Sequence, residues 1–222
     1  MTSASVSRTL DLVALALDDL RAGRPVIVVD DEDRENEGDL VMAAEFATAE
    51  AIGFFVRFTS GLICAPMAPE TADRLCLPLM VPPAAGSAPD EATSFTVSVD
   101  AAGTGSGISA ADRARTARAL ADPRTLPGQL TRPGHMFPLR ARPGGIGERR
   151  GHTEATVDLL RLAGLSPVGV ISEVCQDDGS VAPFEELRVF ADTHRLALVS
   201  IEQIAHAVQQ PGPDGVATWV SG

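Results

Sequence analysis

The sequence is poor in cysteine and has no long apolar run. Its three cysteines show neither the CxxC spacing of a metal or redox motif nor the dense, even-numbered set of a disulfide-stapled secreted domain. No stretch approaches the roughly 20 consecutive apolar residues that a bilayer crossing needs, and the N-terminus lacks the pattern of a signal peptide. These absences predict reduced cysteines, a cytoplasmic location and no membrane partner.

Basic residues are also scarce. The chain has 18 of them against 30 acidic residues, a formal net charge of −12 at pH 7. Such a surface repels the phosphates of nucleic acids and anionic lipids, which argues against DNA, RNA or a membrane as the partner. Arginines are nevertheless clustered at 140–142 and 149–150. A local basic island in an acidic protein favours a small anionic ligand.

The composition is that of a globular protein. The chain has 222 residues, of which 45% are hydrophobic and spread along the whole length, so it can build a real core. Helical and strand patterns alternate, yet several consecutive strands have no helix between them. We therefore expect an α+β fold of three layers, a mixed and twisted β-sheet flanked by helices. No repeat or linker is visible, so 1–222 is predicted to be a single domain with a frayed C-terminal tail.

The apolar periodicity predicts seven helices and seven strands. Thr48 and Ser109 are N-cap signals, and Gly164 is the stop signal of a later helix. The predicted helices cover 10–22, 48–57, 69–75, 109–121, 151–163, 183–195 and 201–209. The predicted strands cover 26–29, 40–44, 61–66, 95–101, 136–141, 168–174 and 196–201. Residues 77–93 and 122–134 are interpreted as irregular loops.

The segment 26–39, VIVVDDEDRENEGD, runs an apolar strand into seven carboxylates and one arginine, Arg34. It has two interpretations: a solvated turn, as most charge runs are, or a site that holds a cation. A calcium-binding EF-hand loop counted from Asp33 has Gly38 at the sixth position but Ala44 at the twelfth, where a glutamate is required. With that class excluded, the candidate ions are Mg²⁺ and Mn²⁺, which prefer hard oxygen ligands. Arg34 fits such a site if an oxygen-rich anion shares it.

The stretch GTGSGISA, 103–110, matches a dinucleotide-binding fingerprint. However, no second strand ending in an acidic residue follows about 20 residues later, and no Walker lysine is present. Two interpretations remain open. Either the amides and the hydroxyls of Thr104 or Ser106 face a polar ligand, or the stretch is a structural turn.

The stretch GGIGERRGHTEATVDLL, 144–160, places two arginines and Gly151 before a helix that starts with His152 and Thr153. Free amides, the helix dipole and guanidinium groups together favour a bound phosphate. The alternative is that His152 and Thr153 only cap the helix. A zinc protease helix is excluded because the HExxH spacing is missing.

Two isolated titratable residues complete the candidates. A lone histidine such as His135 is more often structural than catalytic. Glu173 ends an otherwise apolar strand, where burying a carboxylate without a partner is costly. Glu173 is therefore the stronger of the two as a functional residue.

Several segments together resemble the 3,4-dihydroxy-2-butanone 4-phosphate synthase family of riboflavin biosynthesis. They are, in order, DDEDRENEGD, SGLIC, FTVSVDA, GISAADRARTARALADP, RPGHMFPLRA, RRGHTEATVDLLRLAGL and GVISEV. The resemblance covers roughly 8–205, which we take as the core of the domain. DRENEGD with a downstream GHTEA is a highly specific pair.

The resemblance implies a lyase that converts D-ribulose 5-phosphate to 3,4-dihydroxy-2-butanone 4-phosphate and formate. It also implies a homodimer with active sites near the dimer interface, and Mg²⁺ (or Mn²⁺) as the cofactor. In some relatives a GTP cyclohydrolase domain follows in the same chain. Because this sequence ends at Gly222, we expect that second activity to be absent.

The resemblance also implies roles for individual positions. Glu35 and His152 would bind the metal ion, and Asp30 and Glu37 would hold water on it. The implied substrate contacts are Arg34, Glu35, Asp39, Ser106, Arg149, Arg150, Gly151, His152 and Thr153. The implied catalytic set is His135, Glu173, Asp30, Glu37 and Cys64, of which Cys64 lines the site.

One departure from the family concerns the residues before GIS. The family commonly has two threonines there, whereas this chain has Gly105 and Ser106. Ser106 can supply one of the two hydroxyls. The second role is not carried over to Thr104.

The chemistry gives a reason for such residues to gather. A ketose phosphate must be held by its phosphate and then lose a proton beside its carbonyl, and a chelated cation stabilises the resulting enediolate. Carboxylates and a histidine can move the protons that follow. A metal-dependent sugar-phosphate isomerase or aldolase would need the same groups, and only its product would differ. A non-catalytic nucleotide- or anion-binding module is the rival of another class, although its RNA-binding form would need a basic tract that this chain lacks.

Overall fold

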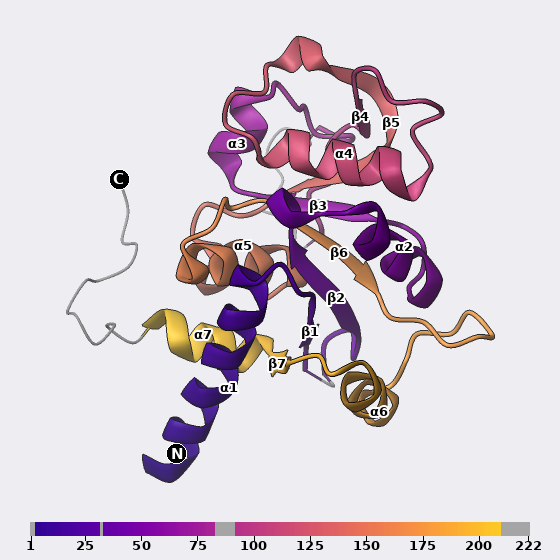
Figure 1. Cartoon of the computed structure of the whole chain (residues 1–222). Coiled ribbons are helices and arrows are strands. Elements are labelled where there is room, and N and C mark those ends of the chain that lie inside the picture. Colours follow the sequence, from indigo (N-terminus) through magenta and orange to yellow (C-terminus); the bar gives the residue numbers. More distant parts are fainter. Residues whose placement is uncertain (1–2, 32, 83–91, 210–222) are drawn as a thin grey trace.

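The centre of the fold is a mixed sheet of seven strands in the order β4-β5-β3-β6-β2-β1-β7 (Figure 1). The computed structural model describes residues 3–31, 33–82 and 92–209. The strands in this part of the chain are β1 (Val26–Val29), β2 (Gly38–Ala43), β3 (Cys64–Met67), β4 (Val99–Ala101), β5 (Leu130–Arg140), β6 (Gly169–Glu173) and β7 (Leu198–Ser200). The α-helices are α1 (Ser3–Arg21), α2 (Ala49–Phe58), α3 (Pro69–Arg74), α4 (Ala110–Ala121), α5 (His152–Ala163), α6 (Phe184–His194) and α7 (Ile201–Gln209).

The sheet contains both strand orientations, as the sequence predicted. β1 pairs antiparallel with β2 and parallel with β7, while β3 pairs parallel with β5 and antiparallel with β6. β2 and β6 are antiparallel, and their register places Asp39 opposite Glu173. Two residues from distant parts of the chain are thereby fixed side by side at the same end of this central strand pair.

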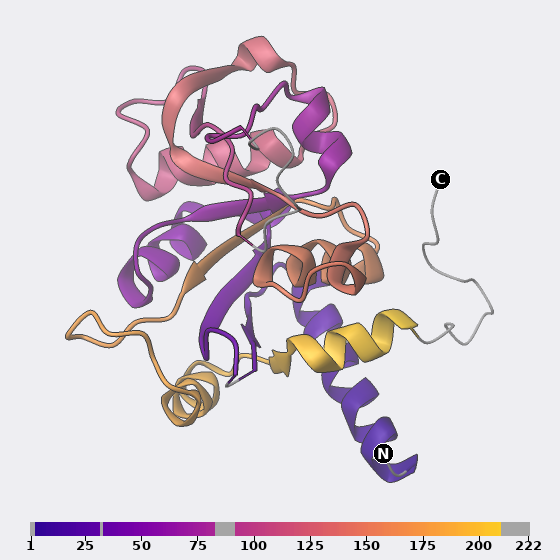
Figure 2. The same ribbon diagram turned by 180° about the vertical axis from the view of Figure 1, so that it is seen from behind.

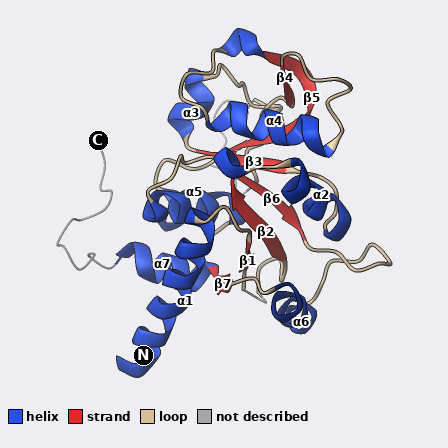
Figure 3. Ribbon diagram, in the orientation of Figure 1, coloured by secondary structure: helices blue, strands red, loops and turns tan. Residues whose placement is uncertain are grey.

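Alternate residues of the central strands face two separate cores, which gives the predicted three layers. In β1, Val26 and Val28 pack with α1, α5 and α7, whereas Ile27 and Val29 pack with the helices of the opposite face. Strands that are buried on both faces become continuous apolar runs, and the VIVV sequence of β1 is one. Figure 2 shows α1, α5 and α7 grouped on one side of the central strands, and Figure 3 separates the helical layers from the sheet by colour.

The helix-end signals read from the sequence are confirmed. The hydroxyl of Thr48 accepts a hydrogen bond from the amide of Ala51, and that of Ser109 accepts one from the amide of Asp112. Gly164 ends α5 in the left-handed region, with φ of 72°. Each of these residues satisfies backbone groups that the helix itself leaves unpaired.

The prediction for 122–134 is wrong at its end, because β5 already begins at Leu130 instead of at Met136. The register between β4 and β5 shifts at a bulge: Val99 pairs with Met136, but the next residue, Asp100, pairs with Thr131. Residues 132–135 are therefore outside the regular ladder, so a proline there leaves no ladder hydrogen bond unmade. Pro133 and Gly134 lie in this bulge, and a proline followed by a glycine is the sequence pattern expected of a loop.

The predicted strand at 95–101 is also shorter in the structure. Only Val99–Ala101 form a strand, and Phe95 and Thr96 contribute isolated bridges. The predicted loop at 77–93 lies partly, and the predicted C-terminal tail wholly, outside the described residues. All three cysteines are free, as predicted. Within the described residues, no helix combines the length and the apolar composition that a membrane crossing would need.

The bulge in β5 generates a prediction about stability. A Cβ added to Gly134 would lie 2.0 Å from the carbonyl carbon of Val99 and 2.2 Å from the amide nitrogen of Asp100. Gly134→Ala should therefore push β4 and β5 apart and destabilise the protein by about 1–3 kcal/mol. At about 2–4 °C per kcal/mol for a chain of this size, thermal unfolding followed by circular dichroism will detect the loss.

The matched control for this substitution is Gly128→Ala, since a Cβ at Gly128 meets nothing within 4 Å. It should leave the midpoint within about 1 °C of wild type, the usual range for an unstrained surface change. Equal midpoints for both variants would mean that the close approach of β4 and β5 at Gly134 is not real.

Candidate functional site

The acidic segment between β1 and β2 is organised around Asp30. Its side chain is 1% exposed and accepts hydrogen bonds from the amides of Glu35 at 3.0 Å and Glu37 at 2.8 Å. The guanidinium of Arg34 donates to the same carboxylate at 2.8 Å. Asp30 therefore fixes the backbone of the turn that carries Glu35 and Glu37. Glu32, within this segment, lies outside the described residues.

The first turn of α5 is attached to the end of β1. His152 is the first residue of the helix and is buried, and its Nε2 donates a hydrogen bond to the carbonyl oxygen of Val28 at 3.2 Å. Burial lowers the pKa of His152, so the ring is neutral near pH 7. With the proton on Nε2, the lone pair is on Nδ1 and is available to a ligand.

The alternative that His152 and Thr153 only cap the helix is wrong. The N-cap position is Gly151, and no side chain makes a capping hydrogen bond there. The first amides of α5 thus remain available to an anion, as a helix N-terminus that binds a phosphate requires.

Glu35 and His152 meet although they are far apart in the sequence. Within the described residues, Asp30, Glu35 and His152 each offer a ligand atom, and these atoms all lie within 4.8 Å of one another. The oxygens of Asp30 already accept three hydrogen bonds, whereas the Glu35 carboxylate accepts one from Arg34 Nη1, at 2.6 Å. A carboxylate and a neutral histidine are suitable ligands for a divalent cation, so the donor set fits a metal ion held by Glu35 and His152.

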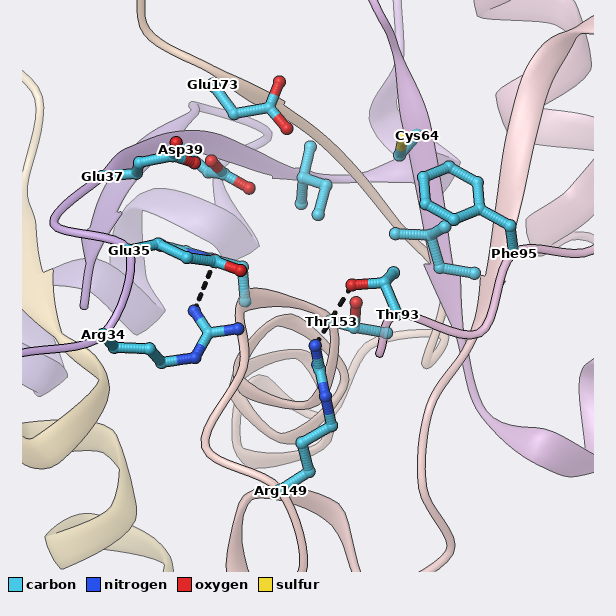
Figure 4. Close-up of a pocket in the computed structure, with 13 residues that line it drawn as sticks. Arg34, Glu35, Glu37, Asp39, Cys64, Thr93, Phe95, Arg149, Thr153 and Glu173 are labelled. Carbon is cyan, nitrogen blue, oxygen red and sulfur yellow. Dashed lines mark hydrogen bonds and ion pairs between the residues drawn. The ribbon is translucent and has the colours of Figure 1, made fainter. Parts of the chain in front are cut away.

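A pocket of about 210 Å³ opens beside this pair (Figure 4). The carboxylates of Glu35, Glu37, Asp39 and Glu173 lie along one side of it, and Cys64 and Phe95 lie on the other. The described residues that line it are Arg34, Glu35, Glu37, Asp39, Cys64, Thr93, Phe95, Leu139, Arg149, His152, Thr153, Ile171 and Glu173.

The carboxylates of this pocket repel one another. Burial, and next the charge of Glu173, raises the pKa of Asp39 well above its ordinary value. Burial and the charge of Glu35 also raise the pKa of Glu37. One oxygen of Asp39, Oδ1, is buried and has no hydrogen-bond partner among the residues that the structure describes. A cationic ligand would relieve both the repulsion and the unpaired oxygen, which is a second indication that the pocket fits a metal ion.

Glu173 and Cys64 reach the pocket from neighbouring strands. Glu173, at the end of β6, accepts a hydrogen bond from the hydroxyl of Ser60 at 2.6 Å. Cys64, at the start of β3, is buried, and this burial raises the pKa of its thiol. The thiol is therefore protonated at neutral pH, which suits a residue that lines the site and does not suit a thiolate nucleophile.

Arg149 lies at the N-terminus of α5, next to Thr153. It donates to the Thr93 hydroxyl at 3.1 Å and to the Glu154 carboxylate at 2.7 Å. A Cβ on Gly151 would lie 2.0 Å from Nη1 of Arg149, so the glycine makes room for this guanidinium. Arg150 is exposed and does not line the pocket.

His135 and Ser106 do not line the pocket of the single chain. His135 instead contacts Asp100, which accepts from the His135 amide at 2.9 Å and bonds its Nδ1 at 2.7 Å. A Cβ on Gly107 would lie 2.6 Å from that same Nδ1, so the glycine stretch packs directly on the histidine. His135 and the glycine stretch that contains Ser106 therefore form a second cluster, whose residues are not among those that line the pocket.

The glycine stretch 103–110 is itself a well-defined turn. The carboxylate of Asp112 accepts from the amides of Gly105 at 3.1 Å and Gly107 at 3.2 Å. The hydroxyl of Thr104 donates to the carbonyl oxygen of Ala101 at 2.9 Å. These amides and this hydroxyl are occupied within the turn, so the structural interpretation holds for them. Ser106 is exposed.

Four residues of the pocket were not anticipated from the sequence: Thr93, Phe95, Leu139 and Ile171. The last three lie in predicted strands, where apolar residues are expected to fill the core. Thr93 belongs to a predicted loop without any motif. Only the pairing of the strands around the pocket identifies them.

Comparison with known proteins gives a consistent result. A family model described as 3,4-dihydroxy-2-butanone 4-phosphate synthase matches residues 14–207. The chain is 56% identical over 194 residues to riboflavin biosynthesis protein RibBA of Nocardia farcinica, covering 86% of this chain and 46% of that protein. The RibBA protein of Mycobacterium tuberculosis is 54% identical over 198 residues, covering 88% and 46%. The chain thus spans about half the length of these curated relatives.

Solved structures agree with the sequence relatives. The 3,4-dihydroxy-2-butanone 4-phosphate synthase of Candida albicans superposes with a TM-score of 0.82 at 45% identity, covering 89% of this chain and 97% of that one. A synthase of the same name, in complex with two magnesium ions, has a TM-score of 0.81 at 44% identity, covering 90% and 96%. The chain therefore belongs to the 3,4-dihydroxy-2-butanone 4-phosphate synthase family.

Proposed function

We propose that this protein is a metal-dependent lyase of riboflavin biosynthesis that converts D-ribulose 5-phosphate to 3,4-dihydroxy-2-butanone 4-phosphate and formate. The observation that carries the proposal is the convergence of Glu35 and His152, beside a pocket that Arg149 and Thr153 also line. One part of this site suits a cation and the other an anion. A sugar phosphate with a chelating carbonyl and hydroxyl presents groups for both parts.

Mg²⁺ is the proposed cofactor, with Mn²⁺ as a substitute, and Glu35 and His152 are the proposed protein ligands. A related synthase has been solved with two magnesium ions, which supports this assignment. When bound, the ion would polarise the substrate carbonyl and make the neighbouring C–H bond more acidic. Asp30 keeps Glu35 in place through the hydrogen bond to its amide. The carboxylates of Asp30 and Glu37 are proposed to hold water on the ion.

The phosphate of the substrate is proposed to lie against the N-terminus of α5. Thr153, the amides that follow Gly151 and the guanidinium of Arg149 converge there. Such groups bind a phosphate through charge-assisted hydrogen bonds and the helix dipole. Arg34 and Asp39, which also line the pocket, are the proposed contacts of the sugar hydroxyls. Arg150 stays a proposed contact only through its backbone, because its side chain is outside the pocket.

The carboxylates that line the pocket are proposed to move protons. The reaction removes a proton beside the carbonyl, rearranges the carbon skeleton and breaks a C–C bond, so that one carbon that does not carry the phosphate leaves as formate. It therefore needs groups that accept and return protons near pH 7. The raised pKa values of Glu37 and Asp39 bring these carboxylates closer to that range, and Glu173 lies opposite Asp39. Cys64 is proposed to line the site with its thiol protonated.

A homodimer is proposed to complete the site. His135 and Ser106, two residues that the family resemblance assigns to catalysis and substrate binding, lie in a separate cluster of the single chain. We propose that this cluster reaches the pocket of a second copy. The acidic net charge of −12 supports the absence of a nucleic acid partner, and the three free cysteines favour a reducing compartment such as the cytoplasm.

The reaction is tested by its products. The purified protein with ribulose 5-phosphate and Mg²⁺ should release formate, detected by NMR, and EDTA should abolish the release. Glu35→Gln keeps the shape of the side chain but weakens the metal site, so we expect formate release to fall by at least about 100-fold, as for loss of a metal function. The exposed Glu50→Gln is the matched control and should retain full activity.

Formate release that persists undiminished in EDTA would contradict the metal-dependent mechanism. A triose or a pentose phosphate as the product, without formate, would indicate the aldolase or isomerase instead. Folding of each variant is checked by its thermal midpoint, so that loss of structure is not mistaken for loss of chemistry.

The shared site is tested by mixing two inactive variants. If one site uses Glu35 of one subunit and His135 of the other, a dimer of Glu35→Gln with His135→Asn contains one doubly altered and one intact site. Half of the dimers are mixed after random reassociation, so activity should return to about a quarter of wild type. The control pair, Glu35→Gln with His152→Ala, should stay inactive because both residues belong to the same chain's site. An inactive first mixture, with mixed dimers verified, would show that His135 does not act across subunits.

A further inference from the structure

Glu154 is a buried carboxylate that the proposed reaction does not use. It lies in the first turn of α5 and is 1% exposed. Its Oε1 accepts a hydrogen bond from the amide of Arg142 at 3.0 Å, and its Oε2 accepts one from Nη1 of Arg149 at 2.7 Å. A carboxylate buried to this degree is costly unless it is fully paired, so these two contacts require an explanation.

Capping of the helix does not explain Glu154. A glutamate at the third helical position often reaches back to the amide of the N-cap residue. Here the N-cap is Gly151, and the carboxylate is directed instead to Arg142 and Arg149. The carboxylate of Glu154 therefore pairs with the side chain of Arg149 and does not cap the helix.

The side chain of Arg149 is held from two directions. Glu154 bonds Nη1, and the hydroxyl of Thr93 accepts from Nη2 at 3.1 Å on the other side of the fork. The arginine side chain is only 11% exposed, yet it lines the pocket together with Thr153 (Figure 4). A planar guanidinium that bonds both of these described residues keeps one orientation before any ligand arrives.

We propose that Glu154, assisted by Thr93, is the positioning residue that aims Arg149 at the phosphate end of the substrate. The proposal rests on the proposed function, which places that phosphate against the N-terminus of α5. An unrestrained arginine loses much rotational freedom when it binds an anion, whereas one that is already fixed loses little. Glu154 acts through Arg149 and is not expected to touch the substrate.

The test separates binding from chemistry. Glu154→Gln keeps an acceptor for the amide of Arg142 and removes the charge that holds Arg149. Because the phosphate is remote from the reacting carbons, KM for ribulose 5-phosphate should rise about tenfold while kcat changes by less than about twofold. Thr93→Val removes the second partner, and its KM should rise by about threefold. Inorganic phosphate, measured by calorimetry, should bind more weakly in the same order.

A double-mutant cycle decides whether Glu154 acts through Arg149. Arg149→Ala should raise KM by more than Glu154→Gln does, and adding Glu154→Gln to Arg149→Ala should change KM no further. A purely structural role of Glu154 would instead lower stability and raise KM to the same extent with or without Arg149, which would overturn the proposal. If Glu154→Gln does not fold, the cycle is repeated with Thr93→Val, which leaves the buried carboxylate intact.

The outcomes distinguish this proposal from the proposed function. If Arg149→Ala weakens phosphate binding but Glu154→Gln and Thr93→Val do not, the positioning role is wrong and the phosphate site stands. If Arg149→Ala leaves both KM and phosphate binding unchanged, the phosphate site itself is misplaced and the positioning role falls with it. Phosphate binding is measured without turnover, so it stays informative even if wild-type protein releases no formate.

Discussion

The hydrogen bond between the His152 ring and the carbonyl oxygen of Val28 determines where α5 begins relative to the sheet. Through it, the open N-terminus of a helix comes to the carboxyl end of β1, where the acidic turn starts. The bond also sets the tautomer of the histidine, because Nε2 carries the proton and Nδ1 keeps the lone pair. The apolar face of α5, with Ala155, Leu159 and Leu160, packs against the sheet and holds the helix in the same place.

Among the described residues, four carboxylates line the pocket against two arginines, so a cationic ligand would bring it closer to charge balance. Glu35, Glu37, Asp39 and Glu173 repel one another at close range, and burial adds to the cost for Asp39. The fold tolerates this because the register of β2 and β6, and the hydrogen bonds around Asp30, hold the backbone regardless of charge. Repulsion between carboxylates lowers the stability of the protein, and a bound cation would relieve it. Such a conflict between stability and binding is frequent at functional sites.

Much of the fold and of the site was predictable from local patterns. Thr48, Ser109 and Gly164 marked helix ends correctly because capping depends on neighbouring residues alone. The early start of β5 was missed because its bulge, with Pro133 and Gly134, depends on a pairing partner distant in sequence. The roles of Phe95, Leu139 and Ile171 in the pocket were hidden for the same reason: an apolar residue in a strand has the same sequence signature whether it faces the core or a ligand. The distance between His135 and the pocket also follows from tertiary packing and not from any motif.

The meeting of Glu35 and His152 around one ion is the central claim. The most direct test is a crystal structure of the protein grown with Mn²⁺, with anomalous diffraction recorded to locate the metal. We expect an anomalous peak between the carboxylate of Glu35 and the ring of His152, at about 2.0–2.2 Å from each, the usual distance for oxygen and nitrogen ligands of such ions. A pocket with full manganese occupancy elsewhere, and no peak between these two residues, would contradict the claim.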